Sequence, residues 1–426
     1  GIPRSRFYQA FSREGRERLD TLMPKILQQC LASEYPDTAL TRSIFLIQSI
    51  GRRSAYLALL SENPLALSQL VRLVCASSEI SQWIAKHPVI LDELLDPIAT
   101  FQVKDRLEIT QELGTKMERA GIDLEAGMEA LREFRQAYTL RVAAADIAGL
   151  IDTKTVALSL SALASALLEE SLKLAEATLD TVERPSDIDL GIIAYGKLGS
   201  EELGYHSDLD IVFVFDESSE SENTELSARR HYYRRLVQRL THILTTRTSA
   251  GEVYEIDTRL RPSGNSGTVV TPLRVYAEYL KESAWTWEHQ ALVRARLVVG
   301  HEHLQRQFRD IRRVILSQPR DNEKLHQDLC QMRQRMRDHH RSEHASIVDF
   351  DLKHDPGGLV DIEFLCQYMI LKHASDHPEL ISCRANQRII TELQNIGLFA
   401  AGDASQLAGA LDIYLAAENE IKLRRG

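Results

Sequence analysis

Two aspartate pairs carry the strongest chemical signal in this sequence of 426 residues. Asp208 and Asp210 stand in "GYHSDLDIVFVF", and Asp187 and Asp189 stand in the similar stretch "PSDIDLGIIAY". Because side chains alternate along a strand, both carboxylates of a pair share one face, with Cα atoms about 7 Å apart. Carboxylates at that spacing can reach a single divalent cation, so either pair is a candidate metal site.

The residues before each pair separate the two candidates. The turn that precedes Asp208 contains Gly196, Gly199, Ser200 and Gly204. Glycines let the backbone approach a ligand closely, and a helix predicted to begin at Ser200 would present free N–H groups to phosphate oxygens. Protein-bound Mg²⁺ is usually held by one or two carboxylates together with the phosphates of the substrate. The later pair is therefore the predicted site, and the earlier pair is expected to mark only the entry to a strand.

A third carboxylate, Asp257, lies on a later predicted strand in "GEVYEIDTRLRPSG". Three carboxylates from two neighbouring strands can hold a metal pair that polarises a phosphorus atom and activates an attacking hydroxyl. Arg259 and Arg261 follow at two-residue steps, so they are predicted to share the face of Asp257 and to neutralise a triphosphate. Ion pairs of one of these arginines with Glu202 or Glu255 are the alternative. The pattern predicts nucleotidyl transfer.

The spacing of apolar residues, which indicates the elements that position these side chains, changes twice along the chain. Apolar residues recur at three- and four-residue spacing to about Leu179, which predicts helices. Short apolar runs bounded by Gly, Ser and Asp follow from Pro185 to about Gly300 and predict strands, after which helical spacing resumes. We expect an α+β, mostly α fold with a helical region at 1–155, a mixed α/β domain at 156–303 and a helical bundle at 304–426.

Composition excludes several classes of protein. The net charge of −10 disfavours a nucleic-acid phosphate backbone as the main partner. The five cysteines form no C-x-x-C pair, which fits a reducing, cytoplasmic setting, and no apolar run approaches the length of a membrane helix. The chain opens on Gly1 without an initiator Met, so it is expected to be a piece of a longer protein.

The stretches "AYGKLGSEELGYHSDLDIVF" and "YEIDTRLRPSGNSG" resemble the nucleotidyltransferase superfamily, and specifically the bacterial glutamine synthetase adenylyltransferase. That enzyme has two related halves, one adding AMP to glutamine synthetase and one removing it by phosphorolysis. The flanking stretches "HPVILDELLDP", "RVAAADIAG" and "KESAWTWEHQALVRAR" resemble its carboxyl-terminal, adenylylating half. The resemblance implies a polymerase-β-like catalytic domain that transfers AMP from ATP to a tyrosine hydroxyl of glutamine synthetase, with release of pyrophosphate.

The resemblance also implies roles and partners. Asp208, Asp210 and Asp257 would be the metal ligands for Mg²⁺, with Mn²⁺ as an alternative, and Asp257 would help to deprotonate the tyrosine. ATP phosphates would lie at Gly199 and Ser200. Implied partners are glutamine synthetase as substrate, and the PII signal protein and glutamine as regulators of the full-length enzyme, without nucleic acid or membrane.

Further residues are expected near the three carboxylates. Lys197 is expected to contact phosphate, with an ion pair to a carboxylate as the alternative. Arg294 and Arg296 are expected to share one strand face beside the nucleotide or the tyrosyl loop. The loop at 354–364 is expected near the mouth of the site. His206 stands where the family commonly has glycine.

Three alternatives remain open. The deadenylylating sister half uses the same three carboxylates in the opposite direction. A template-independent nucleic-acid nucleotidyltransferase would share the motifs but should carry a basic surface, and a non-catalytic nucleotide sensor would be expected to lack one of the carboxylates.

Overall fold

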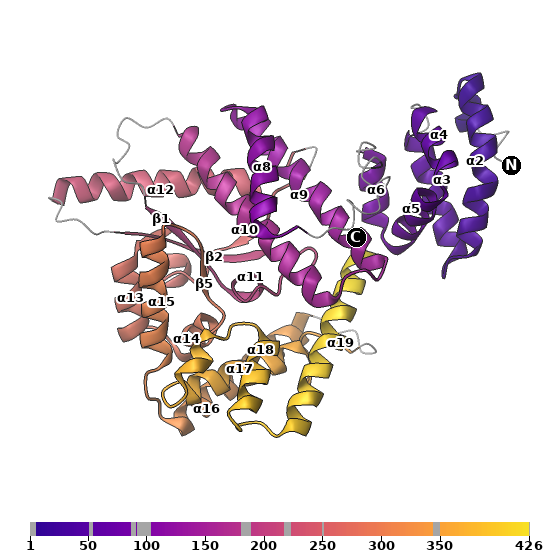
Figure 1. Ribbon diagram of the computed structural model, residues 1–426. Coiled ribbons are helices and arrows are strands. Elements are labelled where there is room, and N and C mark those ends of the chain that lie inside the picture. Colours follow the sequence, from indigo (N-terminus) through magenta and orange to yellow (C-terminus); the bar gives the residue numbers. More distant parts are fainter. Residues whose placement is uncertain are drawn as a thin grey trace. The chain divides into compact units, whose positions relative to one another are not determined.

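The structure is a computed structural model, and it describes the residues 6–50, 54–86, 91, 104–179, 189–216, 223–248, 251–343 and 350–425. The chain divides into two compact units. The first comprises Gly1–Lys104, Gln136–Ser159 and Asn419–Gly426, and the second comprises Asp105–Arg135 and Leu160–Glu418. Three long helices, drawn in magenta and yellow in Figure 1, contribute residues to both units: α9 (Leu124–Ile147), α10 (Thr153–Ala177) and α19 (Ala401–Arg425).

The amino-terminal part of the first unit is built from packed helices: α1 (Arg6–Gln9), α2 (Arg13–Leu31), α3 (Pro36–Ile50), α4 (Ser54–Glu62), α5 (Pro64–Ala76) and α6 (Ser78–Lys86). Local sequence explains their ends. The Ser12 side chain accepts a hydrogen bond from the N–H of Gly15 and caps α2, while Pro64 begins α5, where its missing N–H costs no bond. The predicted helical character of this region is confirmed.

The second unit contains a small mixed sheet. Its strands are β1 (Leu190–Ala194), β2 (Leu209–Phe215), β3 (Ile256–Asp257), β4 (Val270–Pro272) and β5 (Arg296–Val299). β1 lies between β5 and β2 and is antiparallel to both. β3 and β4 run parallel to β2 and pair with the same edge of it, β3 near the start of β2 and β4 near its end.

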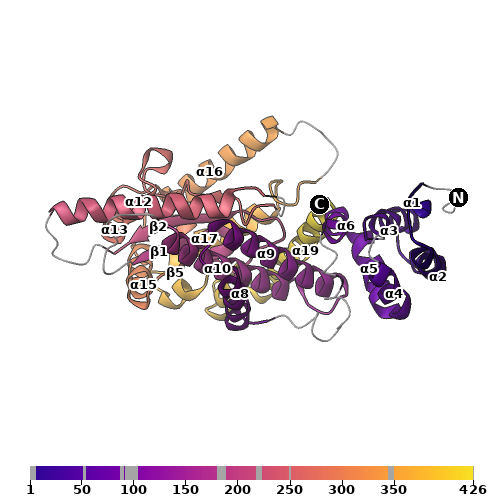
Figure 2. The same ribbon diagram turned by 90° about the horizontal axis from the view of Figure 1, so that it is seen from above.

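Helices surround this sheet in the second unit: α8 (Arg106–Ala120), α11 (Gly196–Gly199), α12 (Asn223–Thr245), α13 (Leu273–Glu282), α14 (Thr286–Leu292), α15 (Glu302–Leu316), α16 (Asn322–Glu343), α17 (Leu359–His373) and α18 (Asn386–Asn395), with short 3₁₀ turns at Gly264–Ser266 and Pro378–Ser382. Two views show α13 and α15 packed side by side (Figures 1 and 2). The predicted mostly helical α+β class is confirmed, whereas the expected three-part boundaries remain a prediction.

One hydrophobic core joins the sheet to the carboxyl-terminal helices. Ile193 of β1 and Val212 of β2 belong to the same buried cluster as Cys366 and Ile370 of α17. Residues on different elements that share a core keep fixed relative positions, because protein interiors are close-packed. Side chains from α17 and α18 can therefore be held in place beside the sheet.

The helix α10 is long and apolar enough to cross a membrane by length and composition, but 72% of its apolar window is buried inside the structure. All five cysteines are free thiols.

Candidate active site

The three predicted metal ligands gather where β2 begins. Asp208 is exposed immediately before β2, and Asp210 is partly buried within it. The Cα of Asp210 pairs with the Cα of Asp257 in the parallel strand β3. Paired residues of neighbouring strands project to the same face at a spacing of about 4.8 Å, so the Asp210 and Asp257 carboxylates are neighbours.

The electrostatics of Asp210 reflect this crowding. Burial, together with the charges of Asp208 and Asp257, raises the pKa of Asp210 to about 6, and the positive charges of Arg294 and Lys353 only partly oppose the rise. Like charges that repel one another in a partly buried place are stabilised by a shared divalent cation. Since the donors are all carboxylate oxygens, the cluster fits a hard ion such as Mg²⁺.

Asp257 is held by its neighbour Arg259. The Arg259 backbone N–H donates to Oδ1 at 2.8 Å, its Nε donates to Oδ2 at 2.7 Å, and its Nη2 also contacts Oδ2. These bonds to Arg259 lower the pKa of Asp257 below its ordinary value. Asp257 is consequently a weaker base than an ordinary carboxylate while Arg259 stays bound.

The expected placement of Arg259 and Arg261 on one strand face is wrong. β3 ends at Asp257, and the bond from the Arg259 N–H to Asp257 bends the chain directly after the strand. Arg261 is buried and donates to the carbonyl and hydroxyl oxygens of Thr258 at 2.9 and 2.7 Å, so it braces the loop that follows β3. Their phosphate roles remain predictions.

The alternative partners expected for these arginines are engaged elsewhere. Glu202 pairs with Arg294 at 2.7 Å, and Glu255 pairs with Arg247 at 3.6 Å.

The glycine turn packs directly against the carboxylates. Gly196 has φ +50°, and a Cβ atom built there would overlap Oδ2 of Asp210. A Cβ atom on Gly199 would overlap the carbonyl oxygens of Arg294 and Ala194. Only glycine fits at either position, and Gly196 brings the backbone against the carboxylate of Asp210.

The helix expected to begin at Ser200 is also misplaced. The short helix α11 instead ends at Gly199, and the Ser200 N–H donates to the carbonyl of Gly196 at 3.2 Å. Glu201 has φ +64° and prevents the helix from continuing. His206 has φ +53°, a left-handed conformation that explains why glycine is common there in the family the sequence resembles.

A buried arginine links this turn to distant helices. Arg294 is 4% exposed, and its Nη2 donates to the Ser200 hydroxyl at 2.6 Å and to the Glu202 carboxylate at 2.7 Å. Its Nη1 donates to Glu363 of α17 at 2.7 Å. Burial alone would lower the pKa of Arg294, but the carboxylates of Glu363 and Glu202 raise it above its ordinary value.

This network corrects the expectation for Arg294 and Arg296. β5 begins at Arg296, whereas Arg294 lies in the turn after α14, so the two do not share a strand face. The network also bears on the stretch 354–364, which is a loop only up to Gly358 and continues into α17. Glu363 in α17 belongs to the network, and Lys353, next to this stretch, acts on Asp210. The loop therefore lies beside the carboxylate cluster, as expected.

Lys197 projects from α11 to the helix α19. Its ammonium group contacts both carboxylate oxygens of Glu418, at 2.7 and 2.8 Å. Both side chains are largely shielded from solvent. The phosphate role of Lys197 stays a prediction, and Glu418 would have to release it.

Only one member of the earlier aspartate pair, Asp189, lies among the described residues. Asp187 lies outside the described residues. Asp189 immediately precedes β1, as expected for a strand entry, at the opposite end of the β1–β2 pair from Asp208 and Asp210.

Sequence reasoning missed Glu202, Glu363 and Glu418 as members of the site. These residues meet their partners only through tertiary contacts, since 92, 69 and 221 positions separate the bonded pairs. The sequence carried no local spacing that could have revealed them.

Comparison with known proteins gives two matches to family models. The model described as "Glutamate-ammonia ligase adenylyltransferase" matches residues 67–311. The model described as "GlnD PII-uridylyltransferase" matches residues 325–426. Both matches lie within the part of the chain that carries the cluster and its supporting helices.

Curated relatives match nearly the whole chain. The chain is 45% identical to a protein of Thioalkalivibrio sulfidiphilus over 96% of its length, 43% identical to one of Nitrosococcus oceani over 98%, and 40% identical to one of Pseudomonas putida over 100%. Each carries the name "Bifunctional glutamine synthetase adenylyltransferase/adenylyl-removing enzyme". The chain spans only 43%, 44% and 46% of their respective lengths.

Proposed function

Because the chain belongs to the glutamate-ammonia ligase adenylyltransferase family, we propose that it transfers AMP from ATP to a tyrosine hydroxyl of glutamine synthetase and releases pyrophosphate. The single observation that supports this most is the register of β2 and β3, which sets Asp210 beside Asp257. The flanking stretches that resemble an adenylylating half favour this direction over removal of AMP.

Asp208, Asp210 and Asp257 would hold Mg²⁺, with Mn²⁺ as an alternative. An ion bound there supplies positive charge that polarises the α-phosphoryl group and stabilises the charge that develops during transfer. Gly196 leaves room for the carboxylate of Asp210, because a Cβ atom at this position would overlap its Oδ2.

Asp257 accepts the tyrosine proton in this proposal. The tyrosine oxygen forms a bond to the α-phosphorus as the bond to pyrophosphate breaks, and the phenolic proton passes to the Asp257 carboxylate. An ordinary tyrosine has a pKa near about 10 and is a poor nucleophile at neutral pH, so a base is needed. Arg259 lowers the pKa of Asp257 while the two are paired, so Arg259 must turn from Asp257 to the triphosphate for this step.

The phosphates of ATP would contact Lys197, Gly199, Ser200, Arg259 and Arg261. Lys197 exchanges Glu418 for phosphate oxygens, and Arg261 contributes by bracing the loop after β3. The carboxyl-terminal helices support nucleotide handling in general, because the same region matches the model named for a uridylyltransferase.

The longer enzyme would be regulated by the PII signal protein and glutamine, and it would control nitrogen assimilation in the cytoplasm. Neither nucleic acid nor a membrane is proposed as a partner. With one carboxylate cluster of this kind among the residues that the structure describes, we expect AMP addition without AMP removal and with little response to PII.

The experiment supplies the chain with ATP labelled at the α-phosphate, Mg²⁺ and unmodified glutamine synthetase. A parallel reaction contains adenylylated glutamine synthetase and inorganic phosphate. Label on the protein, lost in an Asp210→Asn variant, is the expected result. Release of ADP in the parallel reaction, without labelling in the first, would assign the chain to the sister activity instead.

A further inference from the structure

Three side chains meet at the end of the sheet that lies away from the catalytic carboxylates. Asp189 precedes β1, Asp216 follows β2, and His303 lies in the first turn of α15. The antiparallel register pairs Leu190 with Phe215, which brings the two aspartates together. Asp216 lies six positions after Asp210 in the sequence, which corresponds to about 20 Å along an extended strand.

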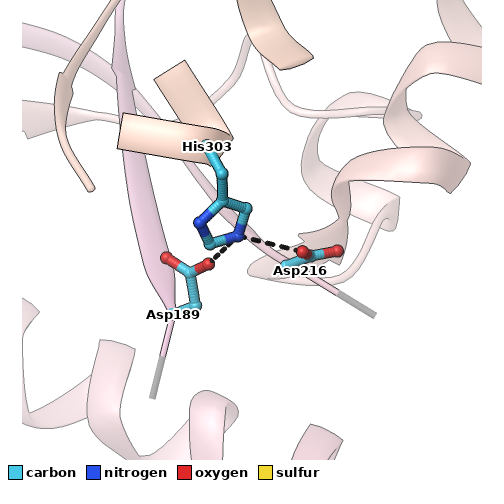
Figure 3. Close-up of side chains that lie close together, drawn as sticks. All are labelled: Asp189, Asp216 and His303. Carbon is cyan, nitrogen blue, oxygen red and sulfur yellow. Dashed lines mark hydrogen bonds and ion pairs between the residues drawn. The ribbon is translucent and has the colours of Figure 1, made fainter. Parts of the chain in front are cut away.

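The imidazole of His303 lies between the two carboxylates (Figure 3). Its Nε2 is 2.5 Å from Oδ2 of Asp189 and 3.0 Å from Oδ2 of Asp216. One ligand atom from each residue lies within 4.8 Å of the other two. The His303 side chain is 48% exposed, so an ion could enter from solvent.

A proton on His303 does not satisfy this arrangement. A single Nε2–H cannot form two well-aligned hydrogen bonds, and two carboxylates with one imidazolium leave a net negative charge. Asp189 is only 8% exposed, and the imidazole of His303 and the backbone N–H of His301 lie beside its carboxylate. A largely buried carboxylate that shares one imidazole with a second carboxylate is costly unless a cation balances the two negative charges.

We propose that Asp189, Asp216 and His303 bind a first-row divalent transition ion such as Zn²⁺. Such an ion replaces the proton, contacts all three groups at once and neutralises both carboxylates. The imidazole nitrogen favours a transition ion over Mg²⁺ or Ca²⁺, which prefer oxygen ligands. Ligand atoms around a tetrahedral Zn²⁺ lie about 3.3 Å apart, so small side-chain rotations suffice.

The bound ion would tie the outer ends of β1 and β2 to the beginning of α15. It is independent of the ion proposed for AMP transfer, because no residue is shared and the two places lie at opposite ends of β2. Either proposal can therefore fail without the other.

The first test measures Zn²⁺ binding to the full chain after chelation and dialysis, by competition with a chromophoric chelator. Asp208→Asn and Asp210→Asn are present throughout, so that the catalytic cluster does not contribute. We expect the chain to bind one equivalent of Zn²⁺ tightly. The affinity for this Zn²⁺ should fall at least tenfold in His303→Ala and in Asp216→Asn.

His326→Ala is the matched control. His326 lies 3.7 Å from the Sγ of exposed Cys330, so this pair could attract Zn²⁺ by itself. The control should keep the tight equivalent within twofold. Equal affinity in His303→Ala and its parent, or loss of the equivalent in His326→Ala alone, would overturn the proposal.

The second test needs no substitution at the proposed ligands, so it does not depend on whether those variants fold. Co²⁺ is added to the same background chain, and its visible absorption reports the ligands. Intense d–d bands without a thiolate charge-transfer band are expected for nitrogen and oxygen ligands. A thiolate band, or the weak spectrum of hydrated Co²⁺, would contradict the assignment.

Discussion

The raised pKa of Asp210 predicts that removing this carboxylate stabilises the fold while it abolishes AMP transfer. Burial and the charges of Asp208 and Asp257 raise the pKa from the ordinary 3.8 to about 6. That rise corresponds to about 3 kcal/mol of unfolding free energy that the ionised carboxylate removes from the folded state. Asp210→Asn should therefore be up to about 3 kcal/mol more stable than the parent at pH 8.

The sign of the pH dependence follows from proton binding. Between the two pKa values the folded parent binds more protons than the unfolded chain, so the stability of the parent falls as pH rises through about 6. The variant lacks this dependence. Its advantage should shrink from about 3 kcal/mol at pH 8 to roughly half of that at pH 5, and should vanish below the unfolded pKa.

The assay is urea unfolding of both proteins in the presence of a chelator, at pH 8 and pH 5. Asp412→Asn is the control, because this exposed carboxylate on α19 should change stability by no more than about 0.5 kcal/mol at either pH. An Asp210→Asn variant that is no more stable than the parent, or whose gain is the same at both pH values, would refute the electrostatic account of the cluster.

Three further substitutions test the parts around Asp210. Asp208→Asn should lower the rate of AMP transfer by about 10³-fold in folded protein, and a rate within about tenfold of the parent would remove Asp208 from the metal ligands. Gly196→Ala should lower the rate at least about 100-fold, because its Cβ would displace the carboxylate of Asp210, while Gly409→Ala, with no atom within 4 Å of its Cβ, should keep the parent rate. Arg294→Leu should cost about 3–5 kcal/mol in urea unfolding because it leaves Glu202 buried without its cation, and a loss no larger than that of the exposed control Arg313→Ala would contradict the importance of the network.

The sequence predicted the centre of the site because strand geometry fixes it. Asp208 immediately precedes β2 and Asp210 lies within it, and Asp257 lies beside Asp210 because β3 pairs with β2. Helical spacing likewise predicted the mostly helical architecture. Both inferences use distances along the chain that are set by local backbone geometry.

The sequence failed where a local bond or a distant partner decides the structure. The alternating pattern after Asp257 predicted a longer strand, but the Arg259 N–H binds the Asp257 side chain and bends the chain. The four-residue helix α11 at Gly196–Gly199 was not predicted, because a helix of about one turn is too short to show a hydrophobic periodicity in the sequence. Arg294 meets Glu202 across 92 positions, and no spacing rule covers that separation.

We propose that this chain adds AMP to a tyrosine of glutamine synthetase by means of the clustered aspartates. The most direct measurement is mass spectrometry of glutamine synthetase peptides after incubation with ATP, Mg²⁺ and either the parent chain or Asp210→Asn. One tyrosine-containing peptide should carry AMP after incubation with the parent and remain unmodified after incubation with the variant. An unmodified tyrosine with the folded parent, or equal modification by both proteins, would contradict the claim.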